Sequence, residues 1–177
     1  MLHETITMPI DNCEHTFETL ASAVLPRHFE RLLAAMTRPI PASSLIGVKS
    51  ASRAALKILG QDADFSGCYV FLEDTKPIYV GISRRVVRRL IQHLNTDTHF
   101  SASLVYRMAS KDYPHTMRRE QAMKDDQFQQ VFFQVQKRLR AMNIAFIPIE
   151  NDLELYVFEV YAAMALDTGT WNTFRTH

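Results

Sequence analysis

The chain has few cysteines and no long apolar run. Its 177 residues include two cysteines, Cys13 and Cys68, which lie far apart and lack the spacing of metal ligands. This pattern argues against a disulfide framework and a cysteine-based zinc site and fits a reducing compartment, so we expect a cytoplasmic protein. No apolar run approaches the roughly 18 residues of a membrane span. The N-terminus also lacks a basic region followed by an apolar core, so we expect neither a membrane segment nor a secretion signal.

The chain also lacks an excess of charge of one sign. Its 20 basic and 19 acidic residues give a net charge of +1, so the total charge does not predict a nucleic-acid partner and only local clustering could. Hydrophobic residues make up 47% and charged residues 22%, which is typical of a globular protein. The length fits one domain with a small appendage.

The most informative segment begins with two short apolar runs. Residues 68–72 and 78–82 are rich in aromatic and β-branched side chains and flank a polar connector, 73–77, which predicts a β-hairpin. A basic segment with an apolar helical stripe follows over about 83–94, and Ser83 is a candidate N-cap for that helix.

The region before the hairpin is predicted to be helical. Apolar residues over 15–36 follow a helical spacing, and Pro26 should break or kink this segment, which predicts two shorter helices. Pro39 and Pro41 mark a turn. We expect residues 1–66 to form a helical appendage packed on the rest of the chain.

The region after the hairpin is predicted to contain further helices and one more strand. Residues 101–109 form a candidate helix, and 117–142 predicts one long helix. Residues 144–149 predict a third strand, in which Pro148 favours an edge position or the strand's end. A last helix is expected over 153–166. The fold class is therefore α/β, with a small three-stranded mixed or antiparallel sheet flanked by helices.

A set of glycine, tyrosine, polar and charged residues occurs along this region in a distinctive order. In chain order the set is Gly67-Cys68-Tyr69, Tyr79-Val80-Gly81, Arg89, His93, Glu159 and Asn172. The order resembles that of the GIY-YIG nuclease superfamily. Cys68 and Val80 replace two isoleucines, at buried-strand positions where a small hydrophobe serves equally well. The resemblance implies a nuclease domain over 67–177 with a three-stranded core and an insertion at about 99–143.

The resemblance also implies a metal-dependent endonuclease that hydrolyses phosphodiester bonds in DNA. Such cleavage requires an activated water, neutralised phosphoryl charge and assistance to the leaving oxygen. Glu159 would be the ligand of Mg²⁺ or Mn²⁺. Arg89 offers a bidentate fork to a phosphate, and His93, one helical turn later, could relay a proton. Asn172 would orient Glu159 or the nearby backbone.

Tyr69 and Tyr79 would project from adjacent strands toward this site. A phenol with a pKa near 10 is a poor base at neutral pH, but a metal ion or an arginine lowers that pKa by favouring phenolate. The sequence leaves open which tyrosine is the general base. We favour Tyr69 as the base and Tyr79 as the residue that positions the water or the phosphate.

Several of these residues have an alternative interpretation. Arg84, Arg85 and Arg88 form, with Arg89, either a phosphate-binding patch for nucleic acid or a solvated helix face. Glu154 competes with Glu159 for the metal.

Three functions are compatible with the sequence. The first is the nuclease, whose DNA substrate could be single- or double-stranded. The second is a nucleic-acid-binding module with little or no catalysis, in which Glu159 or a tyrosine would be misplaced. The third is a protein-interaction domain, with a homodimer built on the helix over 117–142. In that case the stripe of Phe128, Val131, Phe132, Val135 and Leu139 would be exposed in the monomer.

Overall fold

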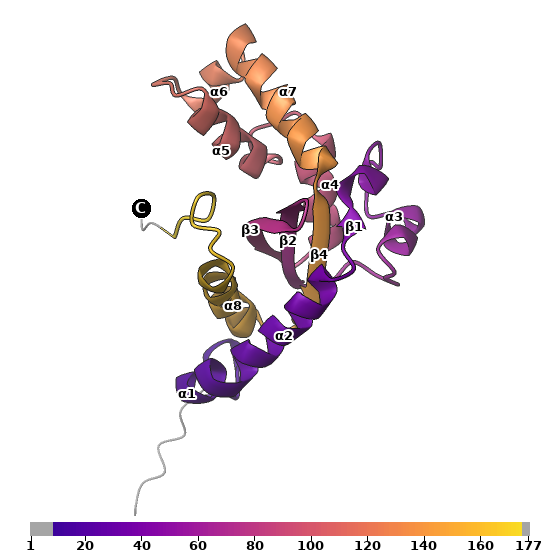
Figure 1. Ribbon diagram of the computed structural model, residues 1–177, viewed down its shortest axis with the longest axis vertical. Helices are drawn as coiled ribbons and strands as arrows, with labels where there is room; N and C mark the ends of the chain where they lie inside the picture. The colour runs from indigo at the N-terminus through magenta and orange to yellow at the C-terminus, as the bar shows by residue number, and fades with distance from the viewer. Residues whose placement is uncertain (1–8, 175–177) are drawn as a thin grey trace, which may run out of the picture.

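The sheet has four antiparallel strands in the order β1-β4-β2-β3 (Figure 1). The computed structural model describes residues 9–174. Its strands are β1 (Ile40–Pro41), β2 (Gly67–Glu73), β3 (Lys76–Ser83) and β4 (Asn143–Pro148). The predicted α/β class is confirmed, but the expected number of three strands is wrong because β1 adds a fourth. β1 has only two residues and lies among prolines, so its sequence carries no strand periodicity.

Eight α-helices occur within residues 9–174. They are α1 (Phe17–Thr19), α2 (Leu25–Met36), α3 (Arg53–Ile58), α4 (Val86–Asn95), α5 (Ser103–Asp112), α6 (Arg119–Ala122), α7 (Asp126–Ala141) and α8 (Asp152–Ala165). Shorter helical turns are η1 (Ile10–Asn12), the π-helical η2 (Leu20–Val24) and η3 (Ala42–Leu45). Among these described helices, none has the length and apolar character that crossing a membrane requires.

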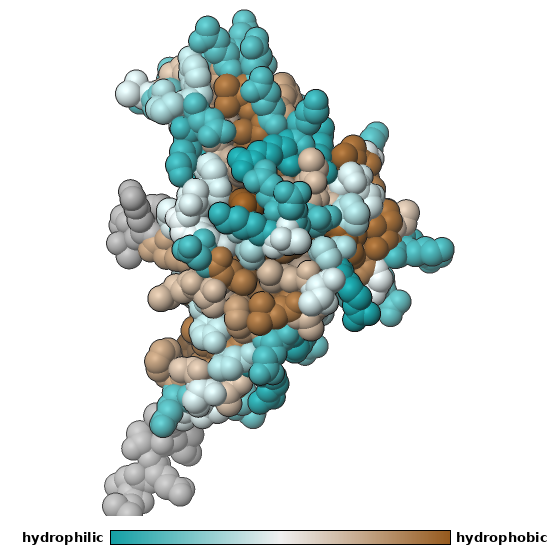
Figure 2. Space-filling view, viewed as in Figure 1, coloured by the Kyte–Doolittle hydropathy of each residue, from teal (hydrophilic) through white to brown (hydrophobic). Residues whose placement is uncertain are grey.

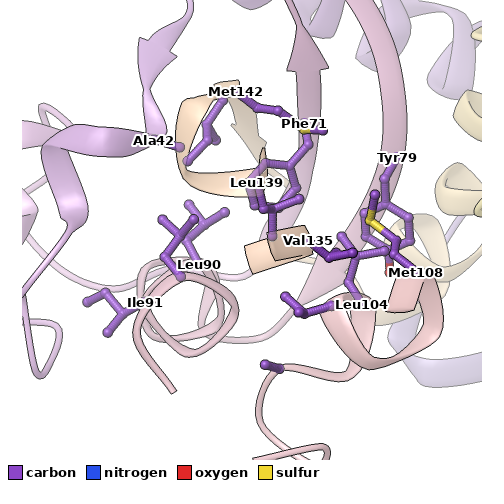
Figure 3. Packing of buried hydrophobic residues seen from close by; sticks show 14 of the residues in the cluster. Ala42, Phe71, Tyr79, Leu90, Ile91, Leu104, Met108, Val135, Leu139 and Met142 are labelled. Carbon is purple, nitrogen blue, oxygen red and sulfur yellow. The ribbon is translucent and has the colours of Figure 1, made fainter. Parts of the chain in front are cut away.

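Side chains alternate along β2 and enter two separate cores. Tyr69 and Phe71 face a first core, formed with α4, α5 and α7. Cys68, Val70 and Leu72 face a second core, formed with α2 and α8. Figure 3 shows side chains of the first core from close by. The tyrosine of the first motif triplet therefore faces α4 and the insert, whereas α8 covers the other face of the sheet.

The predicted hairpin of β2 and β3 is confirmed, with a turn shorter than expected. The turn consists of Asp74 and Thr75, and Asp74 adopts a φ of 54°, a left-handed conformation that aspartate tolerates. The ladder contains an irregularity between Phe71 and Leu72. β3 is an edge strand, where a proline such as Pro77 is tolerated.

The predicted strand after the insert is confirmed as β4, and Pro148 is its last residue. β4 lies between β1 and β2, but β1 pairs only with Asn143 and Ile144. Beyond Ile144, β4 therefore has a ladder partner on one side only, so a proline is tolerated at its end.

The N-terminal region forms one continuous helical run, from α1 through η2 to α2. The predicted break into two helices at Pro26 is wrong, because the π-helical η2, in which the Leu25 N–H donates to the Leu20 carbonyl, leads directly into α2 and Pro26 continues the run. Leu25 and Leu32 of α2 are buried in the second core. The described part of residues 1–66 therefore contributes a strand and core side chains to the sheet. Residues 1–8 of the predicted appendage lie outside the described residues.

The insert between α4 and β4 contains α5, α6 and α7, and hydrophilic side chains gather over its outer part (Figure 2). The predicted single helix over 117–142 is wrong. Asp125 accepts a hydrogen bond from the N–H of Phe128 at 2.8 Å and caps the start of α7. Four of the five residues in the α7 stripe are buried in the first core, namely Phe128, Phe132, Val135 and Leu139. The stripe is therefore not the exposed surface that the homodimer hypothesis required.

Candidate active site

The two glycines of the motif lie where neighbouring atoms leave no room for a side chain. Gly81 is opposite Tyr69 in the β2–β3 ladder, and a Cβ on Gly81 would lie 2.5 Å from Tyr69 Cζ and 2.6 Å from its Oη. A Cβ on Gly67 would clash with the carbonyl oxygen of Ile147 in β4. Glycine at these positions therefore allows β4 to approach β2 and allows the Tyr69 ring to lie across β3.

The hydroxyl of Tyr69 meets His93 in the interior of the protein. Tyr69 Oη and His93 Nε2 are 2.9 Å apart, and the two residues are 1% and 0% exposed. Within residues 9–174, His93 Nδ1 has no hydrogen-bond partner. The pair connects β2 to α4, which also carries Arg89 one turn before His93.

Burial keeps both members of this pair neutral. Loss of contact with water raises the pKa of Tyr69 well above its ordinary value, and neighbouring Tyr79 adds to this effect, whereas the charge of Arg89 lowers that pKa. Burial lowers the pKa of His93 well below its ordinary value, as do the charges of Arg89 and Arg107. At neutral pH a phenol and an imidazole therefore share this hydrogen bond, and formation of phenolate requires additional positive charge.

Arg89 is half-buried where α4 meets the insert. Its Nη1 donates to the carbonyl oxygen of Ser101 at 3.0 Å, and its Nη2 donates to the hydroxyl of Ser103 at 2.6 Å. These bonds connect α4 to the start of α5 and engage both terminal nitrogens. The positive charge of Arg89 lowers the pKa of Tyr69, but both terminal nitrogens of its guanidinium are already bonded to Ser101 and Ser103.

Tyr79 and Glu159 are less deeply buried than Tyr69 and His93. The Tyr79 ring centroid lies 6.3 Å from that of Tyr69, and Tyr79 is 9% exposed. Burial raises the pKa of the Tyr79 phenol, an effect that Arg107 opposes and Glu159 reinforces. Glu159, on α8, is half-buried. Burial also raises the pKa of Glu159, and the charge of Arg107 lowers it.

Asn172 holds the segment after α8 against the edge strand β3. Its Oδ1 accepts the N–H of Val80 at 3.0 Å, and its Nδ2 donates to the carbonyl oxygen of Val80 at 2.7 Å. These bonds satisfy backbone groups of an edge strand directly beside Tyr79. Of the two roles that the sequence left open, Asn172 therefore orients the backbone.

Arg107 belongs to this region but was not identified from the sequence. It is exposed on α5, and its Nη1 donates to the carbonyl oxygen of Trp171 at 2.7 Å. One turn later, Lys111 lies over the Trp171 ring, with Nζ 4.6 Å from the centroid. No motif marks Arg107, because only the fold of the insert brings α5 to Trp171.

The start of α4 also differs from the prediction. Ser83 is not the N-cap, since the helix begins at Val86. The Asp64 carboxylate instead accepts the N–H groups of Val87 and Arg88 at 2.8 and 3.2 Å. A carboxylate at this position is favoured by the helix dipole. Asp64 precedes the hairpin, so this cap depends on tertiary contact.

The three arginines predicted to bind nucleic acid differ in their contacts. Arg84, Arg85 and Arg88 are all exposed at the start of α4. Arg84 forms two hydrogen bonds with Asp152 of α8, at 3.1 and 2.6 Å, so its charge is paired. Arg85 and Arg88 are therefore the better candidates for contacts with phosphate.

Glu154, the alternative metal ligand, is engaged at another contact. Its Oε2 lies 2.9 Å from Nε2 of His28, and its Oε1 lies 3.7 Å from Nε2 of His15. Both histidines come from the N-terminal region. Glu159 is thus the α8 carboxylate whose charge acts on the motif tyrosines.

The acidic groups fit some metal ions better than others. Within residues 9–174 no group of three or more His, Cys, Asp or Glu side chains is arranged to hold a metal ion. A zinc site normally needs three or four such ligands, so the described residues do not fit zinc. Mg²⁺ fits better, because it retains several waters and binds proteins through one or two carboxylates together with phosphate oxygens.

We compared the chain with family models, curated proteins and solved structures. None of them matches. The interpretation of this site therefore depends on the motif residues and on their geometry in this chain.

Proposed function

We propose that this protein is a Mg²⁺- or Mn²⁺-dependent endonuclease that hydrolyses phosphodiester bonds in DNA. The main support is the hydroxyl of Tyr69, which crosses Gly81 and meets His93 in the interior. The partner of this hydroxyl is a titratable imidazole, a group that can exchange a proton with it. Tyr79 and Glu159 both raise the pKa of Tyr69, as expected if the three residues belong to one site.

The proposed reaction begins with activation of a water molecule. Once substrate binding admits the attacking water to the Tyr69 hydroxyl, which is 1% exposed here, Tyr69 would accept a proton of that water while its own proton moves to His93 Nε2, 2.9 Å away. The charge of Arg89 lowers the pKa of Tyr69 but also that of His93, so this transfer would need the additional positive charge of a bound metal ion. Tyr79 would position the water or the phosphate from the edge strand.

The remaining residues would organise the substrate. Glu159 would hold the metal ion, which neutralises charge on the phosphoryl oxygens when it is bound. Asn172 keeps the backbone beside Tyr79 in place through its bonds to Val80. Arg85 and Arg88, exposed at the start of α4, would bind phosphates of the DNA backbone.

A comparison of the two α8 carboxylates tests this proposal. Wild type, Glu159→Gln and Glu154→Gln would be incubated with labelled single- and double-stranded DNA, in Mg²⁺, Mn²⁺ or EDTA. We expect metal-dependent cleavage by the wild type and by Glu154→Gln, and a loss of about 100-fold or more in Glu159→Gln, because it lacks the metal ligand. Equal rates in the two variants would contradict the role of Glu159.

A DNA-binding module without catalysis is the second candidate. The burial of Tyr69 and His93 favours it, as do the bonds that hold Arg89 to Ser101 and Ser103, since all three side chains could simply stabilise the fold. No cleavage by the wild type, together with salt-dependent binding of the same DNA, would support this candidate. If the wild type neither cleaved nor bound the DNA, both candidates would be contradicted.

A further inference from the structure

The insert presents a second arginine to the proposed active site, and its surroundings differ from those of Arg89. Arg89 is half-buried, and both its terminal nitrogens are hydrogen-bonded to the protein. Arg107 is exposed, and within residues 9–174 its guanidinium makes a single hydrogen bond, to the carbonyl oxygen of Trp171. Because a guanidinium carries five N–H donors, most of those of Arg107 remain available to a ligand.

The bond to Trp171 places Arg107 close to the edge strand. Trp171 is followed by Asn172, whose amide brackets the backbone of Val80. Val80 is the strand neighbour of Tyr79. A short chain of hydrogen bonds therefore connects the guanidinium of Arg107 to the part of β3 that carries this tyrosine.

The packing of α5 and the charge of Arg107 agree with a position of Arg107 near Tyr79. Met108, the residue after Arg107, packs with Tyr79 in the first core (Figure 3). The charge of Arg107 lowers the pKa of both Tyr79 and Glu159. Helix α5 thus brings a positive charge to the open part of the proposed site.

We infer that Arg107 binds the non-bridging oxygens of the phosphate that is cleaved, through N–H groups not bonded to Trp171. This assignment rests on the proposed nuclease function and adds a substrate contact to it. The planar guanidinium fits two phosphate oxygens at once. The assignment also explains what the insert contributes, since Arg89 is held by Ser101 and Ser103 and α5 supplies the more available cation.

A purely structural role for Arg107 predicts different behaviour. In that case Arg107 and Lys111 would only clamp the C-terminal segment, one through the Trp171 carbonyl and the other through its ring. Removal of Arg107 would then lower the melting temperature, and any loss of activity would follow from unfolding.

The test compares Arg107→Gln with Arg53→Gln, a matched change at an exposed arginine on α3, which lies away from α5 (Figure 1). Cleavage of labelled DNA in Mg²⁺ and melting temperature would be measured for both variants and the wild type. We expect kcat/KM of Arg107→Gln to fall about 10- to 100-fold at an unchanged melting temperature, with no loss in Arg53→Gln. Added guanidinium ion should restore part of the lost rate.

Each outcome is decisive. Equal cleavage by Arg107→Gln and Arg53→Gln would overturn the assignment and leave the nuclease proposal intact. No cleavage by the wild type would overturn the nuclease proposal and the assignment with it. If Arg107→Gln does not fold, Arg107→Lys tests the assignment instead. The lysine ammonium can still donate to the Trp171 carbonyl, but it cannot form two parallel hydrogen bonds to phosphate. We expect this variant to lose about 5- to 10-fold in kcat/KM, and full activity would overturn the assignment.

Discussion

The candidate active site has an inner and an outer part with opposite physical character. The inner part consists of Tyr69, Gly81 and His93, and the outer part consists of Tyr79, Arg107 and Glu159. The inner part is buried, neutral and packed without spare room. The outer part carries opposite charges and is partly open to water. Changes in the inner part should therefore reduce stability and activity together, whereas changes in the outer part should separate the two.

The largest effect is expected from Gly81→Ala. The new Cβ would meet the Tyr69 ring at 2.5 Å, so the ring or β3 must move, and we expect a loss of about 2–3 kcal/mol in the free energy of unfolding. Gly169→Ala is the matched control, since no atom lies within 4 Å of a Cβ at that position, and it should cost less than about 0.5 kcal/mol. Urea denaturation measures both, and equal losses would show that the inner part is not tightly packed.

A smaller effect is expected when a single hydroxyl is removed. Tyr69→Phe keeps the ring but leaves His93 Nε2 without its partner in the interior, which should cost about 1–2 kcal/mol. Tyr79→Phe removes a hydroxyl from a less deeply buried ring, which is 9% exposed against 1% for Tyr69, and we expect a loss below about 0.5 kcal/mol. Both variants should lower cleavage. A larger loss of stability in Tyr79→Phe would reverse the proposed distinction between inner and outer parts.

Glu159→Gln should have the smallest effect on the free energy of unfolding, and it should raise that free energy, whereas the changes above lower it. Burial raises the pKa of Glu159 in the folded protein above its unfolded value, so the ionised carboxylate disfavours folding. This penalty is present when pH exceeds the folded pKa and disappears below the unfolded pKa. The variant should therefore gain less than about 1 kcal/mol at about pH 8 and nothing at about pH 3.5. Denaturation curves at both pH values check this, and a loss of stability at about pH 8 would contradict it.

Short-range patterns predicted much of the fold. The hairpin of β2 and β3 and the strand β4 were predicted because alternation and turn chemistry act over a few residues. The errors occurred where local patterns compete with longer-range contacts. The helix over 117–142 is interrupted because Asp125 caps a new helix, and Pro26 does not break the N-terminal run because η2 leads into α2. β1 was missed because two residues carry no period.

The candidate site was predictable only in part. The order of the motif residues is visible in the sequence, but the close packing around Gly67 and Gly81 is seen only in the structure. Two residues that belong to the site could not be identified from local sequence patterns. Asp64 caps α4 from the segment before the hairpin, and Arg107 reaches the site from an insert that the motif does not include.

By itself, the sequence determined the hairpin, the strand β4 and the order of the motif residues, because these depend on side-chain period and residue identity. Only the tertiary structure decided that Tyr69 and His93 form a buried hydrogen-bonded pair, that Arg89 is bonded to Ser101 and Ser103, and that Arg107 is bonded to the carbonyl of Trp171. Burial and the proximity of charges set these properties, and both arise from contacts between segments that are far apart in the chain.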